Sequence, residues 1–187
     1  PYNMSHTRIE IIIGPMFSGK STELIRRVSR YEAIGKQILL INHENDTRTT
    51  NFIQTHSRQV KRALKTNSLM PLLEHEHFLD ADVIGIDEAQ FFEDLLDFIN
   101  IAEFHNKIFI IAGLDGDFRR KPIGQILSVI PLCDTVDKLT SLDMMDRDGS
   151  AGIFTKRIGD SESQILIGAE QEYMSVNRRN YLYYKIK

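Results

Sequence analysis

IEIIIGPMFSGKS, residues 9–21, is the stretch that decides the fold. Its isoleucine run predicts a strand over about 8–14 that is buried on both faces. The eight residues from Gly14 to Ser21 fit the pattern G-x-x-x-x-G-K-[ST], and a helical pattern follows over 19–34. Such a turn points backbone amides, and the positive end of the helix dipole, at phosphate oxygens. The stretch therefore predicts a loop that binds nucleotide phosphates.

The side chains of this loop have distinct expected roles. Lys20 can reach the β- and γ-phosphates, and Ser21 can offer its hydroxyl to Mg²⁺. The residues predicted to hold the phosphates are Gly14, Pro15, Met16, Phe17, Ser18, Gly19, Lys20 and Ser21.

Composition limits the class of protein. The chain has 187 residues, of which 42% are hydrophobic and 26% charged, so it can bury a core. Its net charge of −3 gives no global attraction to nucleic acid or an anionic membrane. A single cysteine, Cys133, allows no internal disulfide and suits a reducing compartment. With no secretory signal and no apolar run near the roughly 20 residues of a membrane span, we expect a cytoplasmic protein.

Strand and helix patterns alternate along the chain. Continuous apolar strands that alternate with helices indicate a parallel sheet covered on both faces. We therefore predict an α/β, RecA-like P-loop domain over 8–138 and a small, loop-rich second domain over 139–187. The sequence predicts strands over 8–14, 37–43, 82–87 and 107–113, helices over 19–34, 68–76 and 91–102, and a loop over 44–58.

A second motif, VIGIDE at 83–88, is an apolar strand that ends in two acids. Asp87, at the carboxyl end of the strand, would face the phosphate loop and help to hold Mg²⁺. Glu88 is placed to act as a base on the group that attacks the γ-phosphate. Alone, an Asp-Glu pair here usually caps a helix, but the upstream loop favours the functional interpretation. The two motifs do not separate an ATPase from a kinase.

Five segments, in order, resemble the thymidine kinases of the cellular, type II class. That resemblance implies a P-loop α/β domain with a small lasso domain that closes over the nucleoside. It implies transfer of the γ-phosphate of ATP to the 5′-hydroxyl of thymidine with Mg²⁺, by a cytoplasmic homotetramer that dTTP inhibits. The segments are GPMFSGKSTELIRR at 14–27, VIGIDEAQFF at 83–92, GLDGDFRRKPIG at 113–124, KLT and FTKRIG between 138 and 159, and IGAEQEYMSVNRRNY at 167–181.

The resemblance also implies residue roles. Glu88 matches the proton acceptor, and Arg48, with Lys20, would neutralise charge on the transferring group. Phe118 and Phe91 would stack on the two faces of the base. The implied nucleotide contacts are Asp46, Thr47, Arg48, Asp87, Glu88, Ala89 and Gln90. The implied nucleoside contacts are Met16, Phe91, Leu114, Phe118, Ile123, Thr155 beside the base methyl, Tyr173, and Gln164, Ile165, Leu166, Ile167 and Gly168, whose backbone reads the base edge. Arg119, Arg120 and Lys121 are either a phosphate-side or a solvated cluster.

The chain departs from the family at its metal site. Most members hold a structural zinc with four cysteines, and the matching positions here are Asp143, Asp146, Asn177 and Asn180. A site of four thiolates is excluded, and we expect no structural zinc. Two carboxylates and two amides could hold a hard cation such as Ca²⁺, but a network of carboxylate–amide hydrogen bonds is the simpler expectation. Ile123, where the family commonly has Phe, enlarges the predicted pocket and could loosen base selectivity.

Three other functions remain open at this level. One is a broader pyrimidine deoxynucleoside kinase, another a P-loop ATPase, and the third an inactive nucleotide-binding module. The ATPase would be expected to show basic or aromatic nucleic-acid loops, which this sequence lacks. Intact Lys20, Ser21, Asp87 and Glu88 argue against the inactive module.

Overall fold

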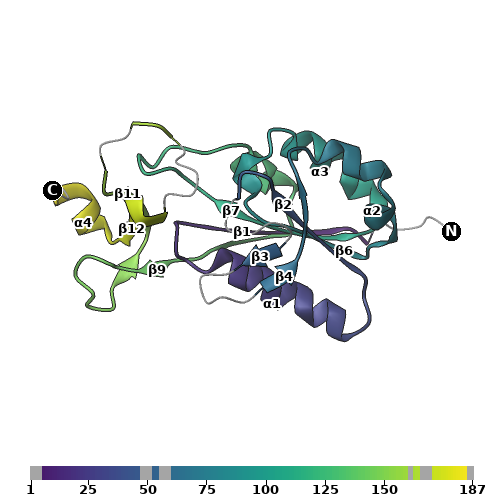
Figure 1. Ribbon diagram of the computed structural model, residues 1–187, viewed down its shortest axis with the longest axis horizontal. Helices are drawn as coiled ribbons and strands as arrows, with labels where there is room; N and C mark the ends of the chain where they lie inside the picture. Colours follow the sequence, from purple (N-terminus) through teal and green to yellow (C-terminus); the bar gives the residue numbers. More distant parts are fainter. Residues whose placement is uncertain (1–5, 47–51, 55–59, 160–161, 165–169, 185–187) are drawn as a thin grey trace.

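The computed structural model describes residues 6–46, 52–54, 60–159, 162–164 and 170–184. Its centre is a six-stranded sheet in which every neighbouring pair runs parallel (Figure 1). This sheet confirms the α/β prediction. In spatial order the strands are β5 (Leu64–Thr66), β2 (Ile38–His43), β6 (Val83–Ile86), β7 (Ile108–Leu114), β1 (Arg8–Gly14) and β8 (Thr135–Lys138).

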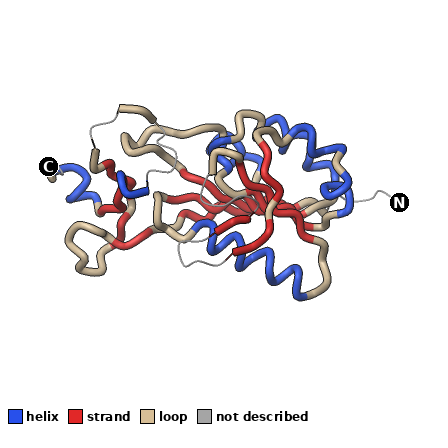
Figure 2. Tube along the Cα trace, in the orientation of Figure 1, coloured by secondary structure: helices blue, strands red, loops and turns tan. Residues whose placement is uncertain are grey.

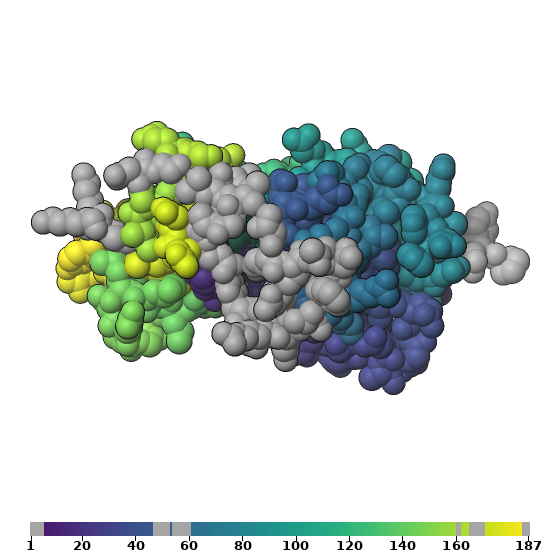
Figure 3. Space-filling view, viewed as in Figure 1, coloured from purple at the N-terminus to yellow at the C-terminus, as the bar shows by residue number. Residues whose placement is uncertain are grey.

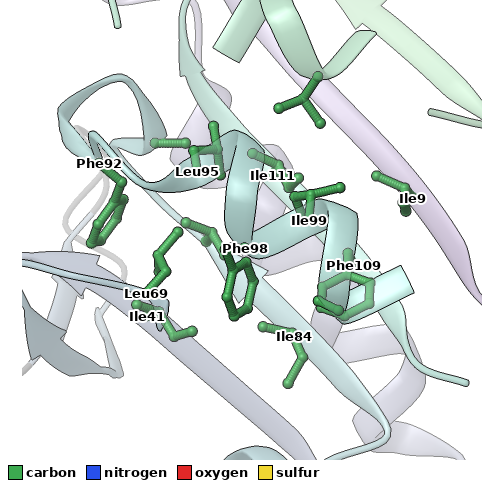
Figure 4. Close-up of a cluster of buried hydrophobic side chains, with 14 of the residues drawn as sticks. Ile9, Ile41, Leu69, Ile84, Phe92, Leu95, Phe98, Ile99, Phe109 and Ile111 are labelled. Carbon is green, nitrogen blue, oxygen red and sulfur yellow. The ribbon is translucent and has the colours of Figure 1, made fainter. Parts of the chain in front are cut away.

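Helices cover both faces of the sheet, as Figure 2 shows. The helix α1 (Lys20–Ala33) packs on one face, and the short α2 (Glu76–Asp80) and α3 (Leu95–Ala102) lie on the other. The α3 face holds the larger core, in which Phe98 and Phe109 meet edge to face (Figure 4). The described chain also has five 3₁₀ segments: η1 (Met70–Glu74), η2 (Ala89–Phe91), η3 (Glu103–His105), η4 (Ile126–Leu132) and η5 (Glu170–Glu172).

The helix that follows the phosphate loop packs against a glycine of the sheet. It buries Leu24, Ile25 and Val28. A Cβ added at Gly85, in β6, would lie 2.5 Å from Leu40 Cδ2 and 3.2 Å from Leu24 Cδ1. The glycine of VIGID therefore leaves the space that α1 needs to pack against the middle of the sheet.

The C-terminal residues form small antiparallel strand pairs (Figure 1), and Figure 3 shows this part of the chain at one end of the molecule. Strand β9 (Ser141–Leu142) pairs with β10 (Ala151–Gly152), and β11 (Phe154–Arg157) pairs with β12 (Tyr173–Val176). The helix α4 (Arg178–Tyr183) follows. Whether this part closes over a ligand as a separate domain stays a prediction.

Several local predictions were wrong. The expected loop over 44–58 contains β3 (Phe52–Gln54), which pairs with β4 (Val60–Arg62). The helix expected over 68–76 is split into η1 and α2, since the backbone is extended at His75. The sheet-edge strands β5 and β8 were not predicted. Both are short and only partly buried, so they lack the apolar run that marks a central strand.

No helix in the described part of the chain has the length and apolar character needed to cross a membrane.

Arg27 joins α1 to two strands of the sheet. Its guanidinium contacts the carboxylates of Glu10 in β1, Glu23 in α1 and Asp137 in β8 at 2.8–2.9 Å. Arg26 pairs with Glu23 as well, at 2.7 Å. Hydrogen bonds from Arg26, and then from Arg27, lower the pKa of Glu23 to about 2. The orientation of the helix that begins at the phosphate loop is therefore fixed partly by charge.

Acid should weaken this link. The folded pKa of Glu23 lies below its ordinary 4.5, so its ionised form stabilises the fold above pH 4.5, and the stabilisation is lost as pH falls through about 2. We expect Glu23→Gln to lower the free energy of unfolding by about 1 kcal/mol at pH 7, a difference that disappears near pH 2. Urea unfolding across this pH range measures it. The matched control is Glu32→Gln. Glu32 is also in α1, and its ion pair with Lys61 of β4 is more exposed, so its loss should change stability less. A Glu23→Gln difference that does not vary with pH would contradict the prediction.

Candidate active site

The phosphate loop begins where β1 leaves the sheet. Gly14 has a φ of 151°, and a Cβ there would lie 2.6 Å from the carbonyl oxygen of Leu139. Only glycine fits this turn without displacing the backbone of the neighbouring segment. At the other end, Gly19 adopts a φ of 83° as the N-cap residue of α1, with no side-chain cap for that helix in the described structure. The amide end of α1 is thus directed into the loop, as phosphate binding requires.

Lysine and serine side chains organise the interior of the loop. Lys20 Nζ donates to the carbonyl oxygen of Pro15 at 2.7 Å and to Ser18 Oγ at 3.4 Å. Ser18 Oγ donates to the same carbonyl at 2.7 Å. The ammonium group of Lys20 therefore lies against oxygens of the loop itself, within reach of an anion held by the loop amides.

Asp87 follows β6 at the same edge of the sheet. Its amide donates to the carbonyl oxygen of Ile41 at 2.9 Å, and the residue is only 1% exposed. The strands β6 and β1 both run parallel to β7, on either side of it, so their carboxyl ends lie at the same edge of the sheet, where the loop begins. A buried carboxylate and the hydroxyl of Ser21 are hard oxygen donors, a set that fits Mg²⁺ carried by a nucleotide.

Glu88 is held by its neighbour Gln90. The amide Nε2 of Gln90 donates to Glu88 Oε2 at 2.6 Å, and Gln90 Oε1 accepts from the amide of Leu114 at 3.0 Å. Gln90 is itself buried, so β7 fixes the amide, which in turn orients the carboxylate. Glu88 also has a left-handed backbone, with φ 51°, a conformation that costs a non-glycine residue about 1 kcal/mol or more. Such strain is common at functional sites.

A hydrogen bond joins the loop to the C-terminal part. The amide of Met16 donates to Thr155 Oγ1, in β11, at 3.0 Å. Thr155 and Arg157 are the buried positions of β11. Arg157 donates to the hydroxyl of Tyr173 and to the carbonyl oxygen of Ser163, and its guanidinium lies 3.8 Å from the centroid of the Phe118 ring. The structure therefore brings Met16, Thr155, Tyr173 and Phe118 into one connected set.

Other residues implied by the resemblance lie in different surroundings. Phe91 packs against the buried ring of His43, with centroids 5.6 Å apart, and burial lowers the pKa of that histidine. Ile123 is buried, and Leu114 is half-buried. The side chain of Gln164 is exposed and donates to Asp117 Oδ2 at 3.1 Å.

Some predicted site residues cannot be placed. Thr47, Arg48 and residues 165–168 lie outside the described residues. Asp46, the first residue of the Asp-Thr-Arg segment, is described and buried, and its carboxylate accepts from the Asn42 amide at 2.7 Å.

The basic cluster after Phe118, Arg119, Arg120 and Lys121, is exposed, which agrees with the solvated alternative. Arg119 forms an ion pair with Glu162 at 3.0 Å. Arg120, which has a φ of 60°, places its guanidinium 4.5 Å from the centroid of the Tyr181 ring. These arginines hold the loop against the C-terminal part through a carboxylate and an aromatic ring.

The four positions that match the family's zinc ligands form a hydrogen-bond network. Asn180 Nδ2 donates to both oxygens of Asp143, at 3.2 and 3.1 Å, and to Asp146 Oδ2 at 2.8 Å. The backbone amide of Asn177 donates to Asp143 Oδ1 at 2.6 Å. Burial favours a raised pKa for Asp143, but the hydrogen bonds from the amides of Asp146 and Asn177 and from Asn180 outweigh it and lower the pKa. The carboxylate–amide network expected from the sequence is present. In the described chain, no cluster of three or more His, Cys, Asp or Glu has a geometry suited to a metal ion.

Arg157 is the site residue that the sequence reasoning missed. In Phe154–Arg157, alternate residues face the same side of a strand, so Arg157 must share a face with Thr155. That period-two pattern was the available signal. The partners of Arg157 lie in three separate segments, at Phe118, Ser163 and Tyr173, and the sequence pattern does not show that these segments meet.

A parallel sheet, a glycine-bounded phosphate loop and an acidic pair at the end of β6 define a P-loop α/β protein with a nucleotide site. The thymidine kinase family matches residues 7–181. Similar proteins include the thymidine kinases of Vaccinia virus (strain Western Reserve), raccoon poxvirus and monkeypox virus. Each is 42% identical over 179 residues, which is 96% of this chain and 99% of the relative. The chain belongs to the thymidine kinase family, whose defining reaction is the phosphorylation of thymidine.

The contact between Gln90 and Glu88 can be tested separately from the base itself. Gln90→Met keeps the length of the side chain but removes both hydrogen bonds. We expect kcat to fall, by less than the factor of about 10²–10⁴ that a catalytic base contributes, because the carboxylate remains but is less well oriented. Steady-state kinetics with thymidine and ATP measure the change, and circular dichroism checks the fold. Unchanged kcat in a folded variant would show that Gln90 does not orient Glu88.

Proposed function

We propose that this protein transfers the γ-phosphate of ATP to the 5′-hydroxyl of thymidine, giving dTMP. The observation that carries the proposal is the Glu88 carboxylate, which Gln90 holds at the edge of the sheet where the loop from Gly14 to Ser21 begins. A nucleotide in that loop would place its terminal phosphate near a fixed base, which suits transfer to a hydroxyl.

Binding of ATP is assigned to the loop and the strand ends beside it. The amides from Pro15 to Ser21 and the ammonium of Lys20 would hold the phosphates, and Asp46, Thr47 and Arg48 would add contacts near the transferring group. Ser21 and Asp87 would hold Mg²⁺, which neutralises phosphate charge. Ala89 would lie beside the same nucleotide.

Glu88 would accept the proton of the 5′-hydroxyl as transfer proceeds. Because phosphoryl transfer has a loose transition state, little charge develops on the attacking oxygen early, and the placement of the hydroxyl matters as much as basicity. The hydrogen bond from Gln90 and the left-handed backbone both restrict where the carboxylate lies.

The thymine base is assigned to the residues that the resemblance implies, in both the sheet domain and the C-terminal part. The aromatic rings of Phe118 and Phe91 would face the base, with the Thr155 methyl beside its 5-methyl group. The pocket also includes Met16, Leu114, Ile123, Tyr173 and the segment Gln164–Gly168. Residues 139–187 would act as the lasso domain that closes over the nucleoside, beside a nucleotide domain at 8–138.

The wider setting follows the resemblance. We infer a cytoplasmic homotetramer, inhibited by dTTP, that serves the supply of DNA precursors and binds neither nucleic acid nor membrane. Sedimentation tests the tetramer, inhibition kinetics test the effect of dTTP, and cell fractionation tests the location.

The network around Asp143 leads us to propose that no structural zinc is needed. Asp143, Asp146, Asn177 and Asn180 offer no thiolate, and amides of Asn177 and Asn180 already donate to the two carboxylates. We expect elemental analysis of the purified protein to find well below one zinc or calcium per chain, and the thermal midpoint to stay unchanged after treatment with EDTA. One bound metal per chain, or a fall in the midpoint with chelator, would contradict the proposal.

A coupled ADP-release assay separates this function from its alternatives. The assay compares thymidine, deoxyuridine, deoxycytidine and no acceptor. Turnover with thymidine supports the proposal, and comparable turnover with all three nucleosides would replace it with a broader pyrimidine deoxynucleoside kinase, for which Ile123 leaves room. Equal ADP release without any nucleoside would indicate an ATPase.

The role of Glu88 is tested in the same assay with Glu88→Gln. We expect binding of ATP and thymidine to be retained, while kcat falls by about 10²–10⁴, because the amide cannot accept the proton. Equilibrium binding of both substrates provides the control. A variant with unchanged kcat would remove Glu88 as the base.

A further inference from the structure

The side chain of Tyr181 anchors the loop that carries Phe118 to the last helix. The hydroxyl of Tyr181, in α4, donates to the main-chain carbonyl oxygen of Phe118 at 2.7 Å, across 63 residues of sequence. The Tyr181 ring packs beside Phe154, with centroids 5.1 Å apart, and lies under the guanidinium of Arg120, which comes from the same loop as Phe118. One aromatic residue therefore contacts this loop through both its hydroxyl and its ring.

The position of Tyr181 is set by the residue before it. Asn180 is 1% exposed, and its side-chain amide donates to Asp143 and Asp146. Its backbone amide donates to Asn177 Oδ1 at 2.8 Å, which caps the start of α4. Because α4 spans only Arg178–Tyr183, this network holds one end of the helix directly.

Lys156 holds the other end of α4. Its ammonium donates to the carbonyl oxygens of Asn180, at 2.6 Å, and of Tyr184. Lys156 belongs to β11, between Thr155, which bonds to the phosphate loop, and Arg157, which stacks on Phe118. The helix is thus fixed at both ends, and little freedom remains for the Tyr181 hydroxyl.

We propose that Tyr181 is a positioning residue for the nucleoside, through which the Asp143–Asn180 network fixes the main chain of Phe118 and hence the aromatic surface under the base. The inference rests on the proposed role of Phe118. In this arrangement the residues that match the family's metal ligands act on substrate binding as well as on folding, and Tyr181 transmits their effect.

The test is Tyr181→Phe, which removes the hydroxyl and keeps the ring against Phe154 and Arg120. We expect the KM for thymidine to rise about fivefold, as the loss of one hydrogen bond allows. The KM for ATP should not change, because the hydroxyl does not contact the phosphate loop in the described structure. The control is Tyr184→Phe, which removes an exposed hydroxyl that accepts from the exposed Arg179 at 3.3 Å and, among the described residues, does not contact the Phe118 loop; it should leave both KM values unchanged.

A double-mutant cycle tests the connection to the network. Asn180→Ala should also raise the KM for thymidine, and adding Tyr181→Phe to it should have little further effect, since both act through the position of Phe118. If the two substitutions raise the KM for thymidine additively, the Asn180 network does not act through Tyr181. If Tyr181→Phe leaves that KM unchanged, Tyr181 has no positioning role, and this result does not depend on whether Asn180→Ala folds. A wild-type protein that fails to phosphorylate thymidine would instead reject the proposed function.

Discussion

The end of β1 is the constraint on which the rest of the site depends. The strand β1, which is buried on both faces, leaves the sheet directly beside Leu139, in the segment that follows β8. The amide of Leu139 bonds to the carbonyl oxygen of Ile13 at 2.8 Å, and the carbonyl oxygen of Leu139 fills the space that a side chain at Gly14 would need. The turn can therefore be made only by glycine. This junction fixes where the phosphate loop starts. The packing of Leu24 and Val28 against Gly85 positions α1, the helix that follows the loop.

Chemical groups gather at this edge because parallel strands end there together. Asp87 and Glu88 leave β6, and Gln90 reaches across to the last residue of β7 to hold the carboxylate. The backbone strain at Glu88 persists because the surrounding sheet and the 3₁₀ turn η2 stabilise the conformation. A carboxylate held in this way is in place before any substrate arrives, which would reduce the ordering needed if it acts as the proposed base.

The C-terminal part is held by different forces. Its strands are two to four residues long, and polar and aromatic contacts supplement the few side chains that they bury. The Asp143–Asn180 network fixes α4, Arg157 lies against Phe118, and Tyr181 bonds to the same residue. Hydrogen bonds are directional, so this network can set the position of a loop even though each bond contributes only about 1 kcal/mol to stability.

The sequence by itself determined the parallel α/β fold, the phosphate loop and the acidic pair, because a buried strand, a glycine turn and a following helix each leave a local pattern. It also indicated that Asp143, Asp146, Asn177 and Asn180 would pair with one another. It did not reveal the edge strands β5 and β8, whose few residues form strands only because a central strand offers them hydrogen-bond partners. Nor did it reveal Arg157 or Tyr181. Their partners lie 6 to 63 residues away, and only the tertiary structure decides which of these groups each side chain meets.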